Sequence, residues 1–388
     1  MNVSSIFTKQ KTFYLQLAVF ALVSAAFANI YITQPVLPVL QQEFQSDIVR
    51  VSFTISAVIL GIALSNLPFG MLADKLPIQP IVLSGGLLVA LCGLFCALTG
   101  QLWVLVGARF FQGVFIPSMT TCLAAFLAKT LPFERLNVIM GAYVSATVLG
   151  GLSGRLIGGW IHPPLHWRYA FVSVACLTIV ATIWAWRVLP RVQAGNKPAP
   201  TAIGYWALIS RWDLLRIYFC AAGSFAVFSS LFNYLPFRLS AAPFNFSTET
   251  VTALYLTYII GIFIGPIAGK ISNRFGSGAA LIGGGTVLFF SLGLILLPSI
   301  MAVIGGLISL CAGYFTIHAA AVGALNRKLS MGQGRANALY VLFYYVGGWI
   351  GITLSGILYS KMGWAAVVCF WAIILLIPIG VGFKERKN

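Results

Sequence analysis

Charged residues are scarce in this sequence. Of its 388 residues, 8% are charged and 60% are hydrophobic, whereas soluble domains carry about 25% charged residues. So few charges could not cover the surface of a water-soluble globular fold, and that class is excluded. Acidic residues are the scarcest: there are seven, and each lies in a loop or at a helix end of the arrangement derived below. They are Glu43, Asp47, Asp74, Glu134, Asp213, Glu249 and Glu385.

Several catalytic signatures are also missing. The sequence has no Gly-x-x-x-x-Gly-Lys-Ser/Thr loop for phosphate and no His-Glu-x-x-His metal motif, which argues against ATP-driven transport and zinc proteolysis. The seven cysteines all lie within long apolar segments, where we expect them to pack rather than to form disulfides or bind metal. We therefore expect no enzyme activity, no catalytic residue, no cofactor and no metal site.

Long apolar runs fill the rest of the chain. A helix rises about 1.5 Å per residue, so about 20 residues cross the hydrocarbon layer of a bilayer. The runs are continuous rather than alternating, which indicates helices and not the strands of a barrel. We therefore predict an all-α membrane protein with twelve transmembrane helices. The predicted spans are 13–36, 51–72, 79–99, 102–126, 136–161, 168–188, 214–237, 250–271, 279–298, 301–325, 335–360 and 364–383.

The net charge of +17 is unevenly distributed among the connecting loops. If both termini are cytoplasmic, most of the Lys and Arg residues outside the spans are cytoplasmic as well, and the outer loops hold only Arg50, Arg168, Arg238 and Lys361. This is the positive-inside distribution of a multi-pass protein of the bacterial inner membrane. The excess of basic residues therefore indicates the orientation of the protein in the membrane and does not predict a nucleic-acid partner.

The two halves of the chain repeat each other. Four glycines of the fifth span recur in the eleventh at one constant offset, and a polar stretch with prolines and arginines separates the halves. We predict an N-terminal six-helix bundle over 1–192, a cytoplasmic linker over 193–213 and a C-terminal six-helix bundle over 214–388, with a ligand site near the midplane between the bundles. The repeated glycines are Gly150, Gly151, Gly154 and Gly159, and Gly347, Gly348, Gly351 and Gly356.

Three motifs stand out within the predicted spans and at their ends. The first motif begins at Gly70 and ends in Asp74 and Lys75, with an echo at Asn273 and Arg274. The second reads Arg-Phe-Phe-Gln-Gly from Arg109. The third is a run of glycines in the fifth span. This third set comprises Gly141, Gly150, Gly154, Gly158 and Gly159.

These three motifs resemble those of the major facilitator superfamily, and within it those of bacterial twelve-span drug/proton antiporters and sugar-efflux-like exporters. The resemblance implies the major facilitator fold, alternating access and export. It also implies that gating residues surround the first and third motifs, with Asp74 latching the cytoplasmic gate. The sequence departs from the family twice: Leu76-Pro-Ile-Gln-Pro80 replaces an expected basic cluster, and Arg155 stands where the third motif has proline. The candidate gating residues are Gly70, Asp74, Lys75, Gly150, Gly154, Gly158, Gly159, Asn273 and Arg274.

Two arginines within the spans suggest the chemistry of the ligand. Arg109 either bonds backbone carbonyls of the first span or takes part in coupling or substrate contact, and the sequence does not separate these roles. For Arg155 we expect exposure to a cavity, where it would favour an anionic or carbonyl-bearing ligand, the alternative being a fixed ion pair. Because no span contains a carboxylate, a cationic substrate is disfavoured.

Further substrate-site candidates come mainly from the first, fourth, seventh and tenth spans, which line the cavity in this superfamily. An aromatic wall with a few polar groups suits a small amphiphile. His318 is the one intramembrane group that titrates near neutral pH and is therefore the candidate for proton coupling, the alternative being Asp74 with its neighbours. The full substrate-binding set is Asn29, Tyr31, Gln34, Arg109, Gln112, Arg155, Asn233, Tyr234, Tyr314, His318 and Tyr344.

These observations predict a secondary active transporter that carries out proton-coupled efflux of a small neutral or anionic amphiphile. Two alternatives stay open: proton-coupled uptake of a small anionic nutrient, and a membrane sensor with the same fold that does not transport. The expected partners are the small-molecule substrate, protons as the coupling ion and the lipid bilayer, and the chain is expected to act as a monomer.

Overall fold

The computed structural model describes residues 9–131, 133–190, 204–329 and 331–386. Within these ranges the chain is helical and has no strand. Most of the predicted linker, 193–203, lies outside the described residues, and its described remainder holds one short helix. The helices of the N-terminal half are α1 (Lys9–Tyr31), α2 (Leu37–Glu43), α3 (Ile48–Lys75), α4 (Ile78–Leu98), α5 (Leu102–Met119), α6 (Thr121–Thr130), α7 (Phe133–Ile161) and α8 (Arg168–Val188).

The second half begins with the short helix α9 (Tyr205–Ile209), which precedes the first long helix of that half. A 3₁₀ segment, η2 (Tyr255–Ile259), joins α11 to α12. The remaining helices are α10 (Trp212–Ser240), α11 (Thr248–Leu254), α12 (Ile260–Phe275), α13 (Ser277–Leu296), α14 (Ile300–Arg327), α15 (Gln333–Ile374) and α16 (Leu376–Arg386).

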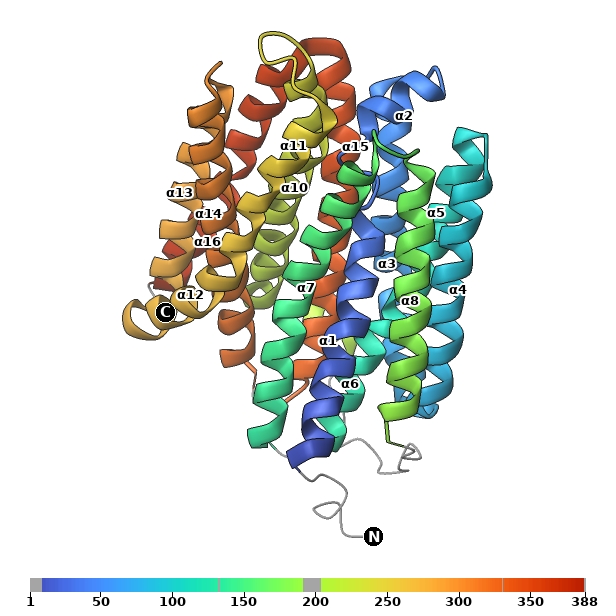
Figure 1. Cartoon of the computed structure of the whole chain (residues 1–388). Helices are drawn as coiled ribbons and strands as arrows, with labels where there is room; N and C mark the ends of the chain where they lie inside the picture. The colour runs from blue at the N-terminus through green and yellow to red at the C-terminus, as the bar shows by residue number, and fades with distance from the viewer. Residues whose placement is uncertain (1–8, 132, 191–203, 330, 387–388) are drawn as a thin grey trace.

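The helices account for the twelve predicted spans. Ten stretches among the described residues are long and apolar enough to cross a bilayer. The last of these, Gln333–Arg386, has 54 residues and breaks at Gly363, where φ is 77° and ψ is −173°, so it supplies two crossings. The 29 residues of α7 supply the remaining one, beside α1 (Figure 1). The all-α, twelve-span prediction is confirmed.

Some predicted spans are interrupted helices. The first ends at Tyr31 rather than at residue 36, because Pro35 lacks the amide hydrogen that would continue the helix, and α2 follows as a separate element. The fourth span is divided between α5 and α6 at Thr120, with Pro117 in the turn before it. The eighth is built from α11, η2 and α12.

The two halves form separate bundles. In the first, α1 packs against α7 and α8, and α5 packs against α3 and α4. In the second, α10 packs against α15, and α13 packs against α14 and α16. The blue-to-green helices therefore lie on one side of Figure 1 and most of the yellow-to-red helices on the other. Contact between the bundles runs mainly through α3 with α15 and through α7 with α11 and η2.

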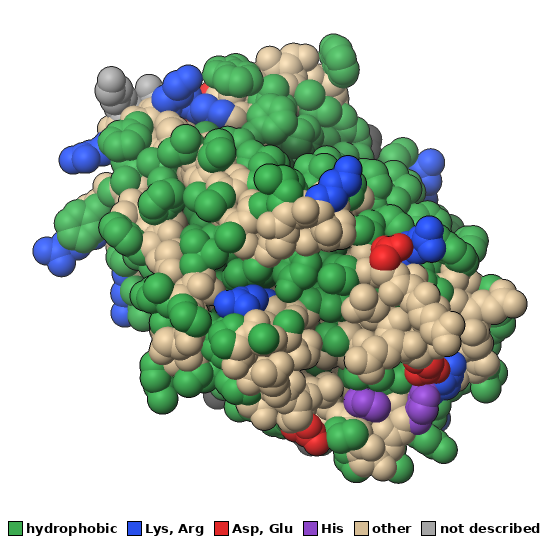
Figure 2. Space-filling model, turned by 90° about the horizontal axis from the view of Figure 1, so that it is seen from above, with side chains coloured by type: hydrophobic (Ala, Val, Ile, Leu, Met, Phe, Trp, Pro, Cys, Tyr) green, Lys and Arg blue, Asp and Glu red, His purple; other side chains and the backbone are tan. Residues whose placement is uncertain are grey.

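We name the two ends of this assembly by the residues that they carry. The terminal end holds the described chain ends, Lys9 and Arg386, and the distal end holds α2 and the start of α11 (Figure 1). Seen from the distal end, the charged side chains are few and scattered, with hydrophobic side chains at the surface between them (Figure 2).

Glycines bring two pairs of helices into backbone contact. A Cβ added at Gly154 of α7 would lie 2.2 Å from the carbonyl oxygen of Ala28 in α1, and one added at Gly158 would lie 1.9 Å from that of Ile32. In the second bundle, a Cβ at Gly351 of α15 would lie 2.7 Å from the carbonyl oxygen of Ala226 in α10. The repeated glycines therefore form equivalent seams, α1–α7 and α10–α15, as close approach through small residues requires.

We expect Gly154→Ala to destabilise the protein, because a methyl group at this seam must push α7 away from α1. Overpacking of this kind costs about 1–3 kcal/mol, and the thermal unfolding midpoint of the detergent-purified protein should fall accordingly. Gly141→Ala in the same helix is the matched control, since a Cβ there would have no neighbour within 4 Å. Equal midpoints for the two variants would contradict the seam.

Candidate substrate site between the two bundles

Arg109 lies inside the N-terminal bundle and caps the end of α1. Its guanidinium is fully buried and donates to the carbonyl oxygens of Asn29 at 2.7 Å, Ile30 at 2.7 Å and Thr54 at 2.9 Å. The first two carbonyls belong to the last turn of α1, where helix carbonyls lack intrahelical partners and the dipole favours a cation. Of the two predicted roles, the geometry agrees with the first, in which Arg109 bonds backbone carbonyls of the first span.

Gln112 and Asn29 continue this network without leaving the N-terminal bundle. Gln112 accepts from Arg109 and donates through Nε2 to Asn29 Oδ1 at 2.8 Å and to the Val89 carbonyl at 3.1 Å. Asn29 Nδ2 donates to Thr178 Oγ1 at 2.8 Å. The structure thus brings three of the substrate candidates together, but as a buried network whose partners all belong to one bundle.

Arg155 occupies the interface between the bundles. On its own side, Nε donates to Gln34 Oε1 at 2.6 Å and the guanidinium carbon lies 4.0 Å from the ring centroid of Tyr31. From the opposite bundle, the rings of Tyr258 and Tyr255 face it at 4.6 Å and 5.4 Å. The expected exposure to a cavity is wrong for this conformation: Arg155 is 1% exposed, because aromatic faces, which attract cations, have replaced water around it.

The surroundings of Arg155 contain an excess of donors. Among the described residues, no carboxylate lies within 4.0 Å of its guanidinium to form an ion pair. Beside it, Gln34 is fully buried and its Nε2 has no hydrogen-bond partner within the described structure. A buried cation and an unsatisfied donor each carry a free-energy cost that an anionic or carbonyl oxygen would relieve.

The opposite bundle contributes a cluster of aromatic side chains. The hydroxyls of Tyr314 (α14) and Tyr344 (α15) lie 2.5 Å apart, and each ring is stacked on a phenylalanine of α10, Phe228 at 3.9 Å and Phe225 at 3.7 Å between centroids. Tyr314 is 14 residues from the start of α14, about 21 Å along the helix at its usual rise, which places the cluster near mid-membrane.

His318 belongs to the same cluster. Its Nδ1 lies 3.0 Å from the Tyr340 hydroxyl, and its ring is 6.1 Å and 5.4 Å from the rings of Tyr314 and Tyr344. The cluster therefore combines flat apolar faces with hydroxyl and imidazole groups that donate and accept hydrogen bonds.

Asn233 and Tyr234 lie apart from these groups, towards the distal end. Asn233 Nδ2 donates to Ser52 Oγ of the other bundle at 3.1 Å, and Tyr234 donates to the Ile352 carbonyl within its own bundle at 2.8 Å. At the same end of the molecule, Trp160 Nε1 of α7 donates across the interface to the carbonyl of Glu249 in α11 at 3.4 Å. These cross-bundle bonds join the two bundles at the distal end in this conformation.

The candidate gating residues lie at two places. Of the third motif, Gly150, Gly154 and Gly158 form the α1–α7 seam, whereas Gly159 meets the other bundle: a Cβ there would lie 1.9 Å from Thr252 Oγ1 of α11. The residues of the first motif and its echo lie at the terminal end. Exposed side chains there are Asp74 and Lys75 at the end of α3, and Asn273 and Arg274 at the end of α12; Gly70 lies one turn before Asp74.

Tyr255 and Tyr258 are the site residues that sequence reasoning missed. They stand on α11–η2–α12, the eighth predicted span, whereas the expectation was that the first, fourth, seventh and tenth spans line the cavity. Residues three apart in a 3₁₀ segment lie on the same side, so both rings face Arg155. The Tyr-x-x-Tyr spacing could have suggested a shared face, but not that the segment is 3₁₀.

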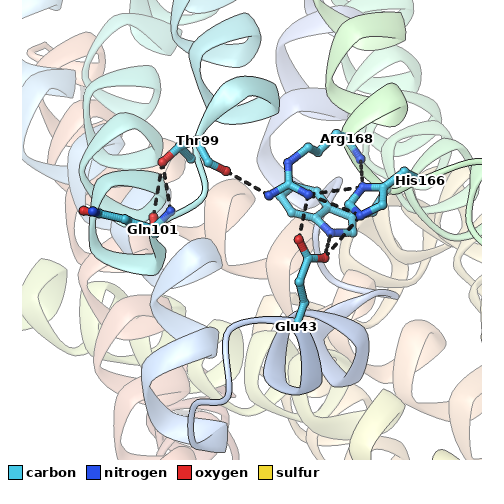
Figure 3. A network of polar contacts seen from close by, with 6 residues as sticks. Glu43, Thr99, Gln101, His166 and Arg168 are labelled. Carbon is cyan, nitrogen blue, oxygen red and sulfur yellow. Dashed lines mark hydrogen bonds and ion pairs between the residues drawn. The ribbon is translucent and has the colours of Figure 1, made fainter.

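A polar network at the distal end of the N-terminal bundle joins α2 to the start of α8 and to the loop after α4 (Figure 3). Glu43 at the end of α2 pairs with Arg168 NH1 at 2.6 Å and accepts from the Trp167 indole, while Arg168 NH2 donates to the Thr99 carbonyl at 2.9 Å. His166 Nε2 lies 3.5 Å from the same carboxylate. Partial burial raises the pKa of Glu43, but the bonds from Trp167 and Arg168 outweigh it and hold the pKa below its ordinary value of 4.5.

Because the pKa of Glu43 is lower in the folded protein than in the unfolded chain, its contribution to stability is present above pH 4.5 and is lost as the pH falls through the folded-state pKa. We therefore expect Glu43→Gln to lower the unfolding midpoint at neutral pH, and the difference from the parent protein to shrink towards acid pH. Midpoints measured across this pH range check it; a difference independent of pH would contradict the charged network.

The fold and this interface define a class: a multi-pass helical membrane protein whose two bundles enclose polar and aromatic groups near the midplane. Comparison with known proteins gives the family. The family model of the Major Facilitator Superfamily matches residues 19–332, and the chain belongs to this superfamily of transporters.

The relatives agree with this assignment. The inner membrane transport protein YnfM of Escherichia coli (strain K12) is 29% identical over 379 residues, covering 96% of this chain and 90% of the relative. Among solved structures, a bacterial homolog of the human lysosomal transporter Spinster, in an inward-facing and unoccupied conformation, gives a TM-score of 0.77 at 17% identity, with 98% of each chain covered. The human organic anion transporter MFSD10 (TETRAN) gives 0.72 at 16% identity, covering 96% of this chain and 99% of the other.

Proposed function

We propose that this transporter resides in the bacterial cytoplasmic membrane with both termini inside and exports a small neutral or anionic amphiphile by proton-coupled antiport. The observation that carries the proposal is Arg155: a buried cation at the interface between the bundles, without a carboxylate partner among the described residues, beside the unsatisfied Nε2 of Gln34. A cationic substrate would meet a like charge there, whereas an oxygen acceptor would receive charge-assisted hydrogen bonds.

The location of the contacts between the bundles supports alternating access. In this conformation the distal end is closed by cross-bundle bonds such as Asn233 to Ser52 and by the packing of Gly159 against Thr252. Opening the distal end must separate these pairs and withdraw Tyr255 and Tyr258 from Arg155. The guanidinium would then face a cavity, with the tyrosine cluster as its apolar wall.

Substrate binding tests the role of Arg155. We expect anionic and neutral amphiphiles, but not lipophilic cations, to raise the unfolding midpoint of the purified protein, since a ligand of the native state stabilises it. Arg155→Gln should weaken binding of an anionic ligand about 10- to 100-fold, the equivalent of losing a charged hydrogen bond of about 1.5–3 kcal/mol.

Arg50→Gln is the matched control, since Arg50 is an arginine exposed at the distal end, where it pairs with Asp47 at the N-cap of α3. Stabilisation by lipophilic cations alone, or full anion binding by Arg155→Gln, would overturn the substrate class. Flux into inside-out vesicles under an imposed proton gradient distinguishes export from the uptake of an anionic nutrient.

We propose that His318 carries the coupled proton. The described groups that face it are the tyrosines Tyr314, Tyr340 and Tyr344, and none of them is a carboxylate. We expect His318→Gln in proteoliposomes to retain substrate exchange in the absence of a gradient but to lose accumulation driven by a proton gradient. Tyr340→Phe, which removes only the hydroxyl that contacts the imidazole, should reduce the driven rate less. Undiminished accumulation by His318→Gln would exclude it as the coupling group.

A further inference from the structure

A second polar site lies at the terminal end, away from the interface between the bundles. It is a cavity of about 390 Å³, walled by α12, α13, α14 and α16, which stand at the margin of the C-terminal bundle (Figure 1). The polar residues that line it are Ser272, Asn273, Ser277, Arg327, Lys328 and Glu385. None of its lining residues belongs to the proposed substrate site, so this cavity is separate from that site.

The charges around the cavity are predominantly positive. Glu385 is the acidic residue of its lining, and both of its oxygens are engaged: Oε1 accepts from Arg216 Nε at 2.8 Å, and Oε2 lies 3.0 Å from Lys328 Nζ. The Glu385 side chain is 6% exposed, so this pairing fixes Lys328 in place. Two cations therefore share one carboxylate.

Arg327 adds a further cation. Its NH2 lies 3.3 Å from the hydroxyl of Ser272, which in turn lies 2.9 Å from that of Ser277. Within the described residues, Arg327 has no carboxylate within 4.0 Å. A guanidinium, an ammonium and two hydroxyls around one space form a donor set for a tetrahedral oxyanion, and guanidinium binds phosphate in a two-pronged manner. The start of α13 adds the positive end of a helix dipole.

The position of the cavity indicates where its ligand comes from. Ser277 is the first residue of one apolar span and Arg327 is the last residue of the next, so the cavity lies at the depth of the lipid headgroups. Two aromatic side chains flank the lining residues in the sequence: Phe275 directly precedes Gly276, and Phe383 lies two residues before Glu385. Their side chains are 61% and 54% exposed. Exposed rings at this depth would lie against acyl chains, below a headgroup in the cavity.

We propose that this cavity binds a negatively charged phosphate group, that of an anionic phospholipid headgroup. A soluble phosphate offers the same chemistry, and the experiment separates the two sources. A bound headgroup would bridge the ends of α12, α13 and α14 and strengthen the packing of the C-terminal bundle at the membrane surface.

Native mass spectrometry of the full chain, titrated with phosphatidylglycerol or phosphatidylcholine, tests the proposal. We expect tighter binding of phosphatidylglycerol, weakened about tenfold by Arg327→Gln, the equivalent of about 1.4 kcal/mol, with binding of phosphatidylcholine unchanged. Asn273→Asp places a negative charge at the exposed rim of the cavity without disturbing the core, so it should also weaken binding even if Arg327→Gln folds poorly. Arg187→Gln, at the exposed end of α8 in the other bundle, is the matched control.

A parallel titration with inorganic phosphate, read by the unfolding midpoint, distinguishes the source. One outcome is that phosphate stabilises the parent protein but neither variant, while the two lipids bind equally. This outcome would support the phosphate site but assign it to a soluble ligand, and it would overturn the proposal of a lipid headgroup. Equal binding of both lipids without stabilisation by phosphate would overturn the site. So would a preference for phosphatidylglycerol that neither variant reduces.

Discussion

Backbone contact between paired helices is the constraint on which the site depends. Where α7 meets α1, a Cβ at Gly151 would lie 3.4 Å from Arg155 NH1 and 3.5 Å from the Tyr31 ring, so the same seam that joins the helices brings the cation to its aromatic neighbour. Where α15 meets α10, a Cβ at Gly348 would lie 2.4 Å from the Phe225 ring, and that ring stacks on Tyr344. Each half of the site is thus held by the glycine seam of its own bundle.

The two buried arginines show how the same side chain takes different roles. Arg109 meets three backbone carbonyls and one amide oxygen within one bundle, so its hydrogen-bonding capacity is used in holding α1, α3 and α5 together. Arg155 meets one amide, one carbonyl of its own helix and the faces of rings from the opposite bundle. Rings attract a cation more weakly than a carboxylate would, and they can withdraw, so the second arginine can exchange its neighbours during a transport cycle.

Much of the fold could be predicted from the sequence because membrane helices follow from apolar length, and because a duplicated glycine pattern indicates two equivalent bundles. The division of the fourth span at Thr120 and the separate helix α2 were not predicted, since hydropathy does not detect a break within an apolar run. The break at Gly363, in contrast, falls between the eleventh and twelfth predicted spans. Within the site, residue type singles out Arg109 and Arg155, because arginine is rare in a membrane span. Their partners could not be predicted, because whether a buried cation meets carbonyls or rings depends on which helix faces it, and the sequence of one helix does not encode that.

The segment η2 has a mechanical consequence. A 3₁₀ helix turns about 120° per residue and rises about 2.0 Å, against about 100° and 1.5 Å for an α-helix. Over the five residues of η2, the two windings differ by about 100° of rotation and about 2.5 Å of length. If the segment relaxed into continuous α-helix, α11 would rotate against α12, and Tyr255 and Tyr258 would swing off the guanidinium through a local rewinding of one span. The ring contacts could therefore be released by torsion within a single helix before the bundles move as rigid bodies.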